Sequence, residues 1–558
     1  MKRTLFVGFD AACWEFFDPL IKRGCLPHIQ QLMESGSWGV LESTLPAQTP
    51  TAWSSIITGK NPGKHGIYDF LLRIPGQKGF VPPTANHRLE FPFWKWLNEN
   101  GLRVGLVNVP FTYPIDPLEG FLVCGFGSPN TNEGIVYPEK EIGWISEHMD
   151  DFRPIVDPMI LRRGTTEEIY RAERKNQSQF IDIALELSSR YQVDVLVINL
   201  LFPDHANHKM PRMEDVERAI IASDNDLGRL INHFEPDNVM LFSDHGSRRV
   251  KGDFLLHAWL RDKGYCVQLH RTPAERADSM NWVLKTWFED RGWSGRTEKI
   301  ARKITSKGLL RLPGGKSSIN WRIIDTQIPF AYEHIFLKGD LDTSRSQILL
   351  GSSYSGVLHF NDNGYKVPEM NSTDDRTRRL SRIIEELSEI SDPDTGQSLF
   401  TKVYKSDSLY NGPATQLAPE LIIDIYDSPW NILSTFRRGY LGESVNNRYF
   451  AQNSKDFGHH SKYGIFVFSG QDFKPDTNGI QGHVMDLPAT ILYLYDVPVP
   501  NDFDGRVMSE VINSKFIDRH PIEFQPGERK ENNSLINSVS SEEDELLVEH
   551  LRALGYLD

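Results

Sequence analysis

TLFVGFD, at residues 4–10, is a short apolar run that ends in a carboxylate, and similar runs recur along the chain. Runs rich in Val, Ile, Leu and Phe are typical of parallel strands buried on both faces of a sheet. The other runs are RVGLVNVPF (103–111), VDVLVINLLF (193–202), NVMLFSD (238–244) and GIFVFSG (464–470). Helical stretches such as 84–100 and 213–234 lie between them. This alternation predicts an α/β fold with a doubly wound, mostly parallel sheet flanked by helices.

The bulk composition is that of a folded protein with a large core. Of 558 residues, 39% are hydrophobic and 24% are charged, and the formal net charge is -14. These fractions are ordinary for a globular protein. A general nucleic-acid binder needs a basic face for its phosphate contacts, so we expect no nucleic-acid partner.

The cysteines and the N-terminus bear on the compartment. The four cysteines, at positions 13, 25, 124 and 266, form no C-x-x-C pair. This sparse usage favours a reducing compartment. The apolar run after MKR is too short for a signal peptide. No segment approaches the roughly 18 apolar residues of a membrane span. We therefore expect a cytoplasmic protein without a membrane span.

One segment interrupts the strand-helix alternation. Residues 267–330 are rich in Lys, Arg, Trp and Ser, and their only sustained periodicity is helical. We interpret them as an inserted cap or lid, with a helical detour on the far side of the sheet as the alternative. The flanking segments 1–266 and 331–515 are then two parts of one catalytic core. Residues 516–558 are predicted to be a flexible linker that leads into a short amphipathic helix.

Acidic and imidazole side chains gather where the predicted strands end or begin. Ligands of doubly wound sheets bind beyond the carboxyl ends of the strands, so these positions are candidates for a site. The candidates are Asp10, Asp204 with His208, Asp244 with His245, and His460, which precedes the run at 464–470. Three carboxylates and three imidazoles form a mixed oxygen and nitrogen set suited to zinc or another first-row divalent ion.

The spacings within this set are physically reasonable. Residues four apart on a helix share a face, so Asp204 and His208 can hold one ion if a helix starts near Asp204. Neighbouring strand residues point in opposite directions, so Asp244 and His245 converge only where the strand breaks, and Gly246 is expected to supply that turn. Each motif alone also has a purely structural explanation, as a helix cap, a turn residue or a surface ion pair. The specificity comes from their occurrence together in this order.

A fifth element is LPAQTPTAWSSIITGKNPGKHGI, at residues 45–67. Thr49 is predicted to be the N-cap of a helix that has Pro50 as its first residue and ends at Gly59. One interpretation is purely structural, with Thr49 only capping this helix. A helix N-terminus also favours a phosphate, and a hydroxyl held there by a divalent cation would lose its proton readily. Thr51 is the rival nucleophile, although it would lie inside the first turn.

Read in order, these motifs resemble the type I phosphodiesterase/nucleotide pyrophosphatase branch of the alkaline-phosphatase superfamily. The motifs are Asp10, TPTAW followed by TGKNPGKHGI, D-x-x-x-H at 204–208, SDHG at 243–246 and GHHSKYG at 458–464. Further stretches are similar to soluble phosphohydrolase/phosphomutase-like members: VGLVNVPFTYP, SDPDTGQSLFTKVY, APELII and MDLPATILYLYDVPVPNDFDGRV. The resemblance runs from about residue 4 to about residue 510 and implies an alkaline-phosphatase-like fold.

The resemblance also implies roles for single residues. Thr49 would be the nucleophile and form a phosphothreonine intermediate. Two divalent ions are implied, zinc or else manganese. The first would be held by Asp10, Thr49, Asp244 and His245, and the second by Asp204, His208 and His460. His205 and His459 lie close to these residues in the sequence, but the resemblance does not make them metal ligands. The implied substrate is a small phosphorylated molecule such as a nucleotide, a sugar nucleotide or another phosphodiester.

The chain departs from the family pattern at one position. Nucleotide pyrophosphatases of this branch commonly carry an Asn three residues after the nucleophile, where this chain has Ala52. Nucleotide specificity is therefore open, and another phosphate donor is expected. The main alternative to hydrolysis of phosphodiesters or pyrophosphates is a phosphomutase or phosphotransferase that uses the same site. A second alternative is a metal-free scaffold or binding protein on the same fold.

Three cations follow the SDHG motif. Arg248, Arg249 and Lys251 could contact a second anionic group of a substrate. A solvated loop is the simpler interpretation of such a charge run, and we expect it here.

Overall fold

The computed structural model describes most of the chain. The described residues are 2–74, 80–129, 133–267, 341–342, 344–361, 373–434, 449–452, 458–475, 477–530, 547–548, 551–552 and 554. The predicted cap at 267–330 lies outside them except for its first residue. Within these ranges, none of the helices combines the length and the apolar character that crossing a membrane requires.

The apolar runs of the sequence form the centre of a nine-stranded sheet of order β18-β2-β17-β7-β1-β6-β3-β4-β5. The central five strands are parallel: β7 (Asn238–Phe242), β1 (Thr4–Phe9), β6 (Val195–Leu200), β3 (Val104–Val107) and β4 (Gly120–Val123). The flanking strands are β18 (Thr477–His483), β2 (Gly36–Glu42), β17 (Tyr463–Gly470) and β5 (Val136–Tyr137). Strand β17 runs antiparallel to both of its neighbours. The predicted α/β sheet is therefore confirmed.

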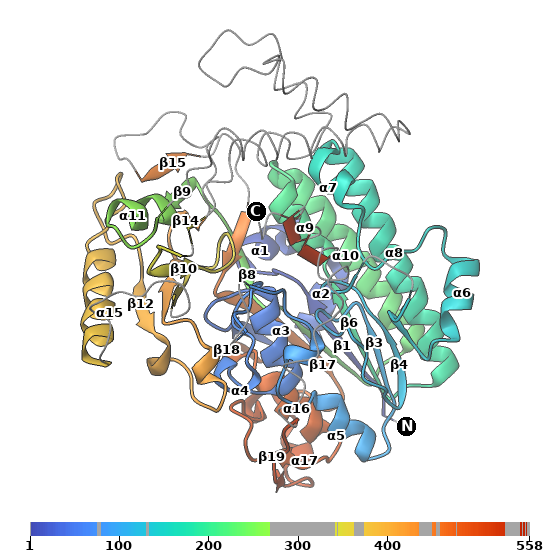
Figure 1. Cartoon of the computed structure of the whole chain (residues 1–558). Coiled ribbons are helices and arrows are strands. Elements are labelled where there is room, and N and C mark those ends of the chain that lie inside the picture. The colour runs from blue at the N-terminus through green and yellow to red at the C-terminus, as the bar shows by residue number, and fades with distance from the viewer. Residues whose placement is uncertain are drawn as a thin grey trace, which may run out of the picture.

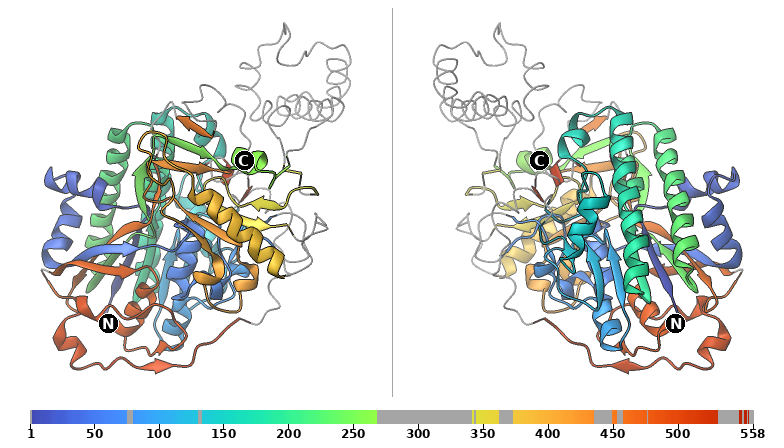
Figure 2. Two further views of the ribbon diagram at one scale, coloured as in Figure 1. Left: turned by 90° about the vertical axis from the view of Figure 1, so that its left-hand side faces the viewer. Right: turned by 90° about the vertical axis from the view of Figure 1, so that its right-hand side faces the viewer.

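Helices cover both faces of this sheet (Figures 1 and 2). Helices α2, α8 and α10 pack on one side, and α3, α5 and α16 pack together on the other. The helices are α1 (Trp14–Lys22), α2 (Pro27–Ser35), α3 (Thr49–Thr58), α4 (Pro62–His65), α5 (Phe93–Glu99), α6 (Glu141–His148), α7 (Pro158–Arg163), α8 (Thr166–Tyr191), α9 (Phe202–Lys209), α10 (Met213–Phe234), α11 (Leu256–Asp262), α15 (Thr373–Ser388), α16 (Asp486–Leu494) and α17 (Ser514–Ile517). Rings of Phe6, Trp53 and Phe242 pack across the core.

A smaller antiparallel sheet lies beside the main one, to its left in Figure 1. Its order is β10-β11-β13-β12, and it has its own buried apolar cluster with α11 and α15. Its strands are β10 (Ile348–Leu350), β11 (Val357–Phe360), β12 (Lys402–Lys405) and β13 (Leu421–Asp424). Short ladders link it to the main sheet: β9 (Gly252–Leu255) with β14 (Trp430–Leu433) and β15 (Phe450–Gln452), and β8 (Gly246–Arg249) with β16 (Gly458–Ser461). The chain thus leaves the main sheet after β7 and returns through β16 to β17.

The C-terminal part of the chain packs back on the main core. Strands β19 (Val499–Pro500) and β20 (Phe524–Gln525) pair there, in parallel. The described residues of the predicted terminal helix include Leu547, Leu551 and Leu554, and all three are buried in the main apolar cluster. The predicted linker is described as far as residue 530.

A buried ion pair anchors the loop after α3 to this C-terminal part. The Lys60 side chain is 2% exposed, and its Nζ lies 2.6 Å from both Glu90 Oε2 and Asp502 Oδ2. Arg529 Nε adds a contact of 3.3 Å to Glu90 Oε1. Removing one partner of a buried pair leaves an uncompensated charge, which costs more than the pair contributes when intact.

We predict that Lys60→Ala lowers the free energy of unfolding by about 3 kcal/mol, because Glu90 would remain buried with only Arg529 beside it. Urea unfolding followed by circular dichroism measures this change. Lys140→Ala is the matched control, since that side chain is 73% exposed, and its effect should stay below about 0.5 kcal/mol. Equal effects of the two substitutions would contradict the importance of the buried pair.

Candidate metal centre

The first part of the site is built at the end of β1. Asp10 is fully buried, and Asn199 Nδ2 donates a hydrogen bond of 2.9 Å to its Oδ2. Its other oxygen, Oδ1, has no hydrogen-bond partner among the described residues. Ala11 has a φ of 60°, and its N–H points to Asp244 Oδ1 at 3.4 Å. The left-handed turn at Ala11 therefore directs the end of β1 toward the end of β7.

Asp244 and His245 converge with Asp10 just beyond β7. His245 Nε2 lies 3.3 Å from Asp244 Oδ2 and 3.8 Å from Asp10 Oδ1. His245 Nδ1 faces the Gly246 carbonyl at 3.2 Å, so Nδ1 carries the proton and Nε2 offers a lone pair. The expected convergence of Asp244 and His245 is therefore found.

The reason for a glycine at position 246 differs from the expected one. Gly246 does not have a positive φ; it is the first residue of β8 and pairs with Ser461. A Cβ at this position would overlap the carbonyl oxygen of Tyr463. The glycine thus allows a close approach of backbones rather than a special turn.

A second group comes from α9 and β16. Asp204 and His208 lie one turn apart on α9, with His208 Nε2 3.3 Å from Asp204 Oδ1. His460 on β16 places its Nε2 3.7 Å from the same oxygen and 2.9 Å from His208 Nε2. The Ala47 carbonyl accepts from His460 Nδ1 at 2.9 Å, which leaves a lone pair on His460 Nε2. A cation among these atoms would satisfy the two imidazoles and the carboxylate together.

The two groups are adjacent. The His245 and His460 rings stack with their centroids 3.8 Å apart. Within each group, the candidate ligand atoms lie within 4.8 Å of one another. The structure thus brings all six acidic and imidazole candidates into two neighbouring clusters, Asp10–Asp244–His245 and Asp204–His208–His460.

Thr49 lies at the N-terminus of α3, next to the first cluster. Its side chain is fully buried, and its Oγ1 is 3.3 Å from His245 Nε2. The cap of α3 is Gln48, with Thr49 as the first helical residue, so the predicted cap position is wrong by one residue. Boundaries of this kind depend on backbone angles that the sequence does not specify to one residue. Gly59 ends the helix with a φ of 68°, as predicted.

The electrostatics of the clusters call for cations. Burial, together with the charges of Asp244 and Asp204, holds the pKa of Asp10 well above its usual range. Burial and the charge of Asp204 raise the pKa of Asp244 to about 8. Burial acts in the same direction on Asp204, but His208 and His460 outweigh it and lower that pKa. Ionised carboxylates at this depth need compensation. The donor set, with free oxygens on Asp10 and Asp244, fits divalent metal ions.

The two neighbouring histidines, His205 and His459, have partners outside the two clusters. His205 Nδ1 pairs with Glu173 Oε1 at 2.8 Å, on the side of α9 that packs on α8. His459 Nδ1 bonds the Asn431 amide at 2.9 Å, and its ring contacts Tyr354. This geometry supports the choice of His208 and His460 over their neighbours.

The sequence did not single out several residues beside the second cluster. A small cavity there is lined by Gln48, His208, Tyr354, Tyr426, Asn431, His459 and His460. Gln48 could have been noticed because it directly precedes Thr49. Tyr354 and Tyr426 come from loops of the smaller sheet and Asn431 comes from β14, and no sequence pattern links them to the site.

The cations after SDHG are not all solvated. Arg248 is 7% exposed and donates to the carbonyl oxygens of His460, Ser428 and Trp430. Lys251 pairs with Asp392 and Asp394. The expectation of a solvated loop is therefore wrong for Arg248, which ties the backbone of β16 to the start of β14.

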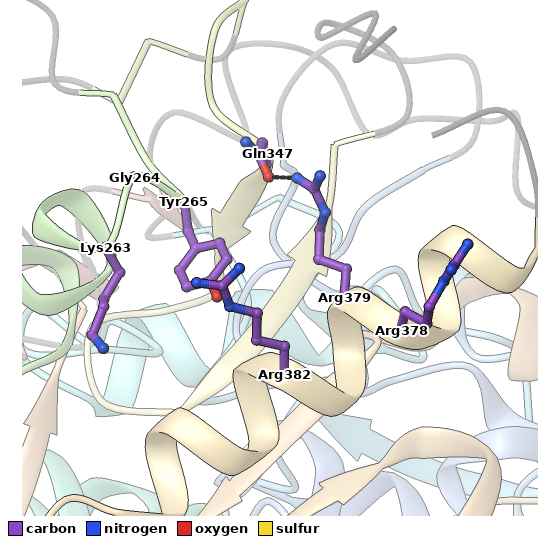
Figure 3. A pocket seen from close by; sticks show the side chains of 7 residues that line it. All are labelled: Lys263, Gly264, Tyr265, Gln347, Arg378, Arg379 and Arg382. Carbon is purple, nitrogen blue, oxygen red and sulfur yellow. Dashed lines mark hydrogen bonds between the residues drawn. The ribbon is translucent and has the colours of Figure 1, made fainter. Parts of the chain in front are cut away.

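A second, larger hollow of about 370 Å³ lies between α11 and α15. It is lined by Lys263, Gly264, Tyr265, Gln347, Arg378, Arg379 and Arg382 (Figure 3). Glu386 partly neutralises this basic surface, at 3.5 Å from Lys263 and 3.0 Å from Arg382. None of the candidate catalytic residues lines this hollow.

The doubly wound sheet, with carboxylates and imidazoles beyond its strand ends, is the architecture of an alkaline-phosphatase-like phosphohydrolase. A family model, type I phosphodiesterase / nucleotide pyrophosphatase, matches residues 4–461. The chain belongs to this family, and it is accordingly a hydrolase that acts on phosphate esters. No curated protein shows significant sequence similarity to it.

The chain is similar to several solved structures at low sequence identity. Human ectonucleotide pyrophosphatase/phosphodiesterase 5 is 13% identical with a TM-score of 0.49, over 92% of this chain and 100% of that chain. An inactive variant of the murine protein in complex with AMP is 12% identical with a TM-score of 0.49 and the same coverage. A mutant of alkaline phosphatase PafA is 13% identical with a TM-score of 0.50, also over 92% and 100%. The PafA likeness supports the fold alone.

We predict that Gly246→Ala lowers both metal content and turnover. The added Cβ would push β8 away from the Tyr463 carbonyl and displace His245 and His460. Misplacement of about 1 Å can cost about a hundredfold in rate. Elemental analysis and an esterase assay on the purified variant measure the two effects. Gly143→Ala is the control, since its Cβ would meet open space, and wild-type behaviour of Gly246→Ala would refute the packing argument.

Proposed function

We propose that the protein is a metal-dependent phosphohydrolase that cleaves phosphodiester or pyrophosphate bonds through a phosphothreonine at Thr49. The observation that carries the proposal is the position of Thr49 Oγ1, at a helix N-terminus and 3.3 Å from His245 Nε2. A nucleophile in this position is close to both clusters. It also lies where a helix N-terminus favours an anionic phosphoryl group.

The residues support a division of labour between two divalent ions, zinc or else manganese. Asp10, Thr49, Asp244 and His245 would hold one ion, and Asp204, His208 and His460 the other. Bound ions would supply Lewis-acid charge that favours loss of the Thr49 proton and stabilises the departing oxygen. With three carboxylates, two such ions leave a formal charge of about +1. That charge suits an anionic substrate on an acidic protein.

Thr49 would act in two displacements at phosphorus. In the first, Thr49 Oγ1 forms a bond to phosphorus while the bond to the leaving oxygen breaks. In the second, the oxygen of a water molecule bonds to phosphorus and the bond to Thr49 breaks, which restores the hydroxyl. The N–H groups in the first turn of α3 orient the phosphoryl oxygens in both steps.

The substrate class follows from the family. We propose a small phosphorylated molecule such as a nucleotide, a sugar nucleotide or another phosphodiester. Ala52 occupies the place where related nucleotide pyrophosphatases commonly have an Asn, so the phosphate contacts of this chain must differ. A screen of diesters against monoesters with metal-loaded enzyme would identify the preferred class.

We predict that Thr49→Ala abolishes turnover of bis(p-nitrophenyl) phosphate, by a factor of about 10⁴ or more. Thr49→Ser should retain part of the activity, because it keeps a hydroxyl on the same carbon. Thr51→Ala is the control; Thr51 Oγ1 is buried without a hydrogen bond in the described part of the protein, so its loss should leave the rate unchanged. Full activity of Thr49→Ala would rule out this nucleophile.

We also predict that the purified protein binds about two equivalents of divalent metal. Asp244→Asn and His208→Ala should each weaken one site, because each removes a ligand from a different cluster. Inductively coupled plasma mass spectrometry of dialysed protein measures the content. Unchanged content in both variants would contradict the ligand assignment. Movement of phosphate within a sugar phosphate, without ester hydrolysis, would instead identify the mutase alternative.

A further inference from the structure

The small cavity beside the second cluster is lined by two buried polar side chains, Gln48 and Tyr426, that lie close enough to interact with each other. It has a volume of about 10 Å³, close to the size needed for one water molecule or a single oxygen atom. His208 and His460 form one wall, and Gln48, directly before Thr49 in the chain, forms another. An atom in this cavity would therefore contact two candidate metal ligands and the residue that precedes the proposed nucleophile.

Gln48 is unusual for its position. It is the cap residue of α3, yet its side chain makes no capping hydrogen bond, and shorter residues that can cap are strongly preferred there. It is 3% exposed. A buried carboxamide without a strong partner costs free energy, so a ligand that accepts its hydrogen bond would offset this cost.

Tyr426 faces Gln48 from the smaller sheet. It follows β13 and is 4% exposed. Its hydroxyl interacts with the Gln48 side chain and the Ala47 backbone, although neither contact has the geometry of a full hydrogen bond. Burial raises the pKa of Tyr426, although the nearby Gln48 side chain and the backbone of Ala47 oppose this effect. A tyrosine hydroxyl is protonated near neutral pH, so it can donate to an acceptor in the cavity.

The other polar groups of the cavity have partners. The Asn431 amide is bonded to His459 Nδ1, and the Tyr354 ring packs against the His459 ring with centroids 4.8 Å apart. Among the residues that the structure describes, no lysine or arginine lines the cavity. The Gln48 carboxamide has two N–H donors and Tyr426 has one O–H donor. The two side chains can therefore contact each other and still donate to an incoming acceptor, and a single oxygen atom is the acceptor that fits.

We propose that the Gln48 carboxamide and the Tyr426 hydroxyl together bind one non-bridging oxygen of the substrate phosphoryl group. This assignment rests on the proposed function, because it places the phosphorus within reach of Thr49. Two neutral donors aimed at one oxygen hold the phosphoryl group in a fixed rotation. They also supply a phosphate contact in a chain that has Ala52 after its nucleophile.

The test uses metal-loaded enzyme and two readouts, kcat/KM for bis(p-nitrophenyl) phosphate and the inhibition constant of inorganic phosphate. Tyr426→Phe removes only the hydroxyl, and kcat/KM should fall by about tenfold to a hundredfold. The inhibition constant should rise at least about fivefold. Gln48→Ala should act similarly, and the double variant should lose less than the product of the two effects, because both donors bind one oxygen.

Tyr410→Phe and Tyr68→Phe are the matched controls. Both hydroxyls are buried and donate to backbone carbonyls, of Leu45 and Ala414 respectively, and neither residue lines the cavity. These variants should change thermal stability without changing the phosphate inhibition constant. If they raise it as much as Tyr426→Phe does, the role of Tyr426 is structural and the proposal is wrong.

Two failures can be told apart. If Tyr426→Phe and Gln48→Ala keep wild-type constants while Thr49→Ala is inactive, the oxygen-binding assignment is overturned and the proposed function stands. If the wild-type protein hydrolyses no ester, binding of inorganic phosphate is measured directly by calorimetry. Equal binding by wild-type and Tyr426→Phe protein would then overturn the assignment as well.

Discussion

The arrangement of this protein depends on the burial of three carboxylates beside three imidazoles at one edge of a sheet. Asp10, Asp204 and Asp244 are all at most 1% exposed, and ionised groups at that depth are unstable unless opposite charge compensates them. The imidazoles do not offset the burial of the three carboxylates equally. The pKa of Asp204 is lowered, whereas the pKa values of Asp10 and Asp244 are raised. Bound divalent cations, as proposed, would complete this charge balance and would favour ionisation of a hydroxyl beside them.

These groups lie together only because the chain comes back to the site after the long segment between β8 and β16. It leaves the site at Gly246 and comes back at Gly458, and the β8–β16 pairing closes this loop. Arg248 strengthens the closure, because its buried guanidinium binds backbone carbonyls on both β16 and the segment before β14. The same return brings parts of the smaller sheet, including Tyr426, against the second cluster. The segment between β8 and β16 therefore contributes side chains to the site.

A separate set of contacts fixes the helix that bears Thr49. The Gly59 carbonyl accepts from the N–H groups of Asp504 and Gly505, and Lys60 pairs with buried Glu90 and with Asp502. The C-terminal part of the chain thus holds the far end of α3. A helix held at its far end keeps its N-terminal hydroxyl in place, which the proposed attack by Thr49 requires.

The sequence by itself determined the main strands and the order in which the candidate site residues occur, and it predicted Thr49 as the nucleophile, because apolar runs and short-range spacing reflect local geometry. It did not determine why Gly246 must be glycine or that Arg248 is buried, since both depend on backbones that approach only in the folded chain. Nor could it link Gln48 with Tyr426, which are 378 positions apart in the numbering. Such a contact is set by the docking of two sheets, and that docking leaves no periodic trace in the sequence.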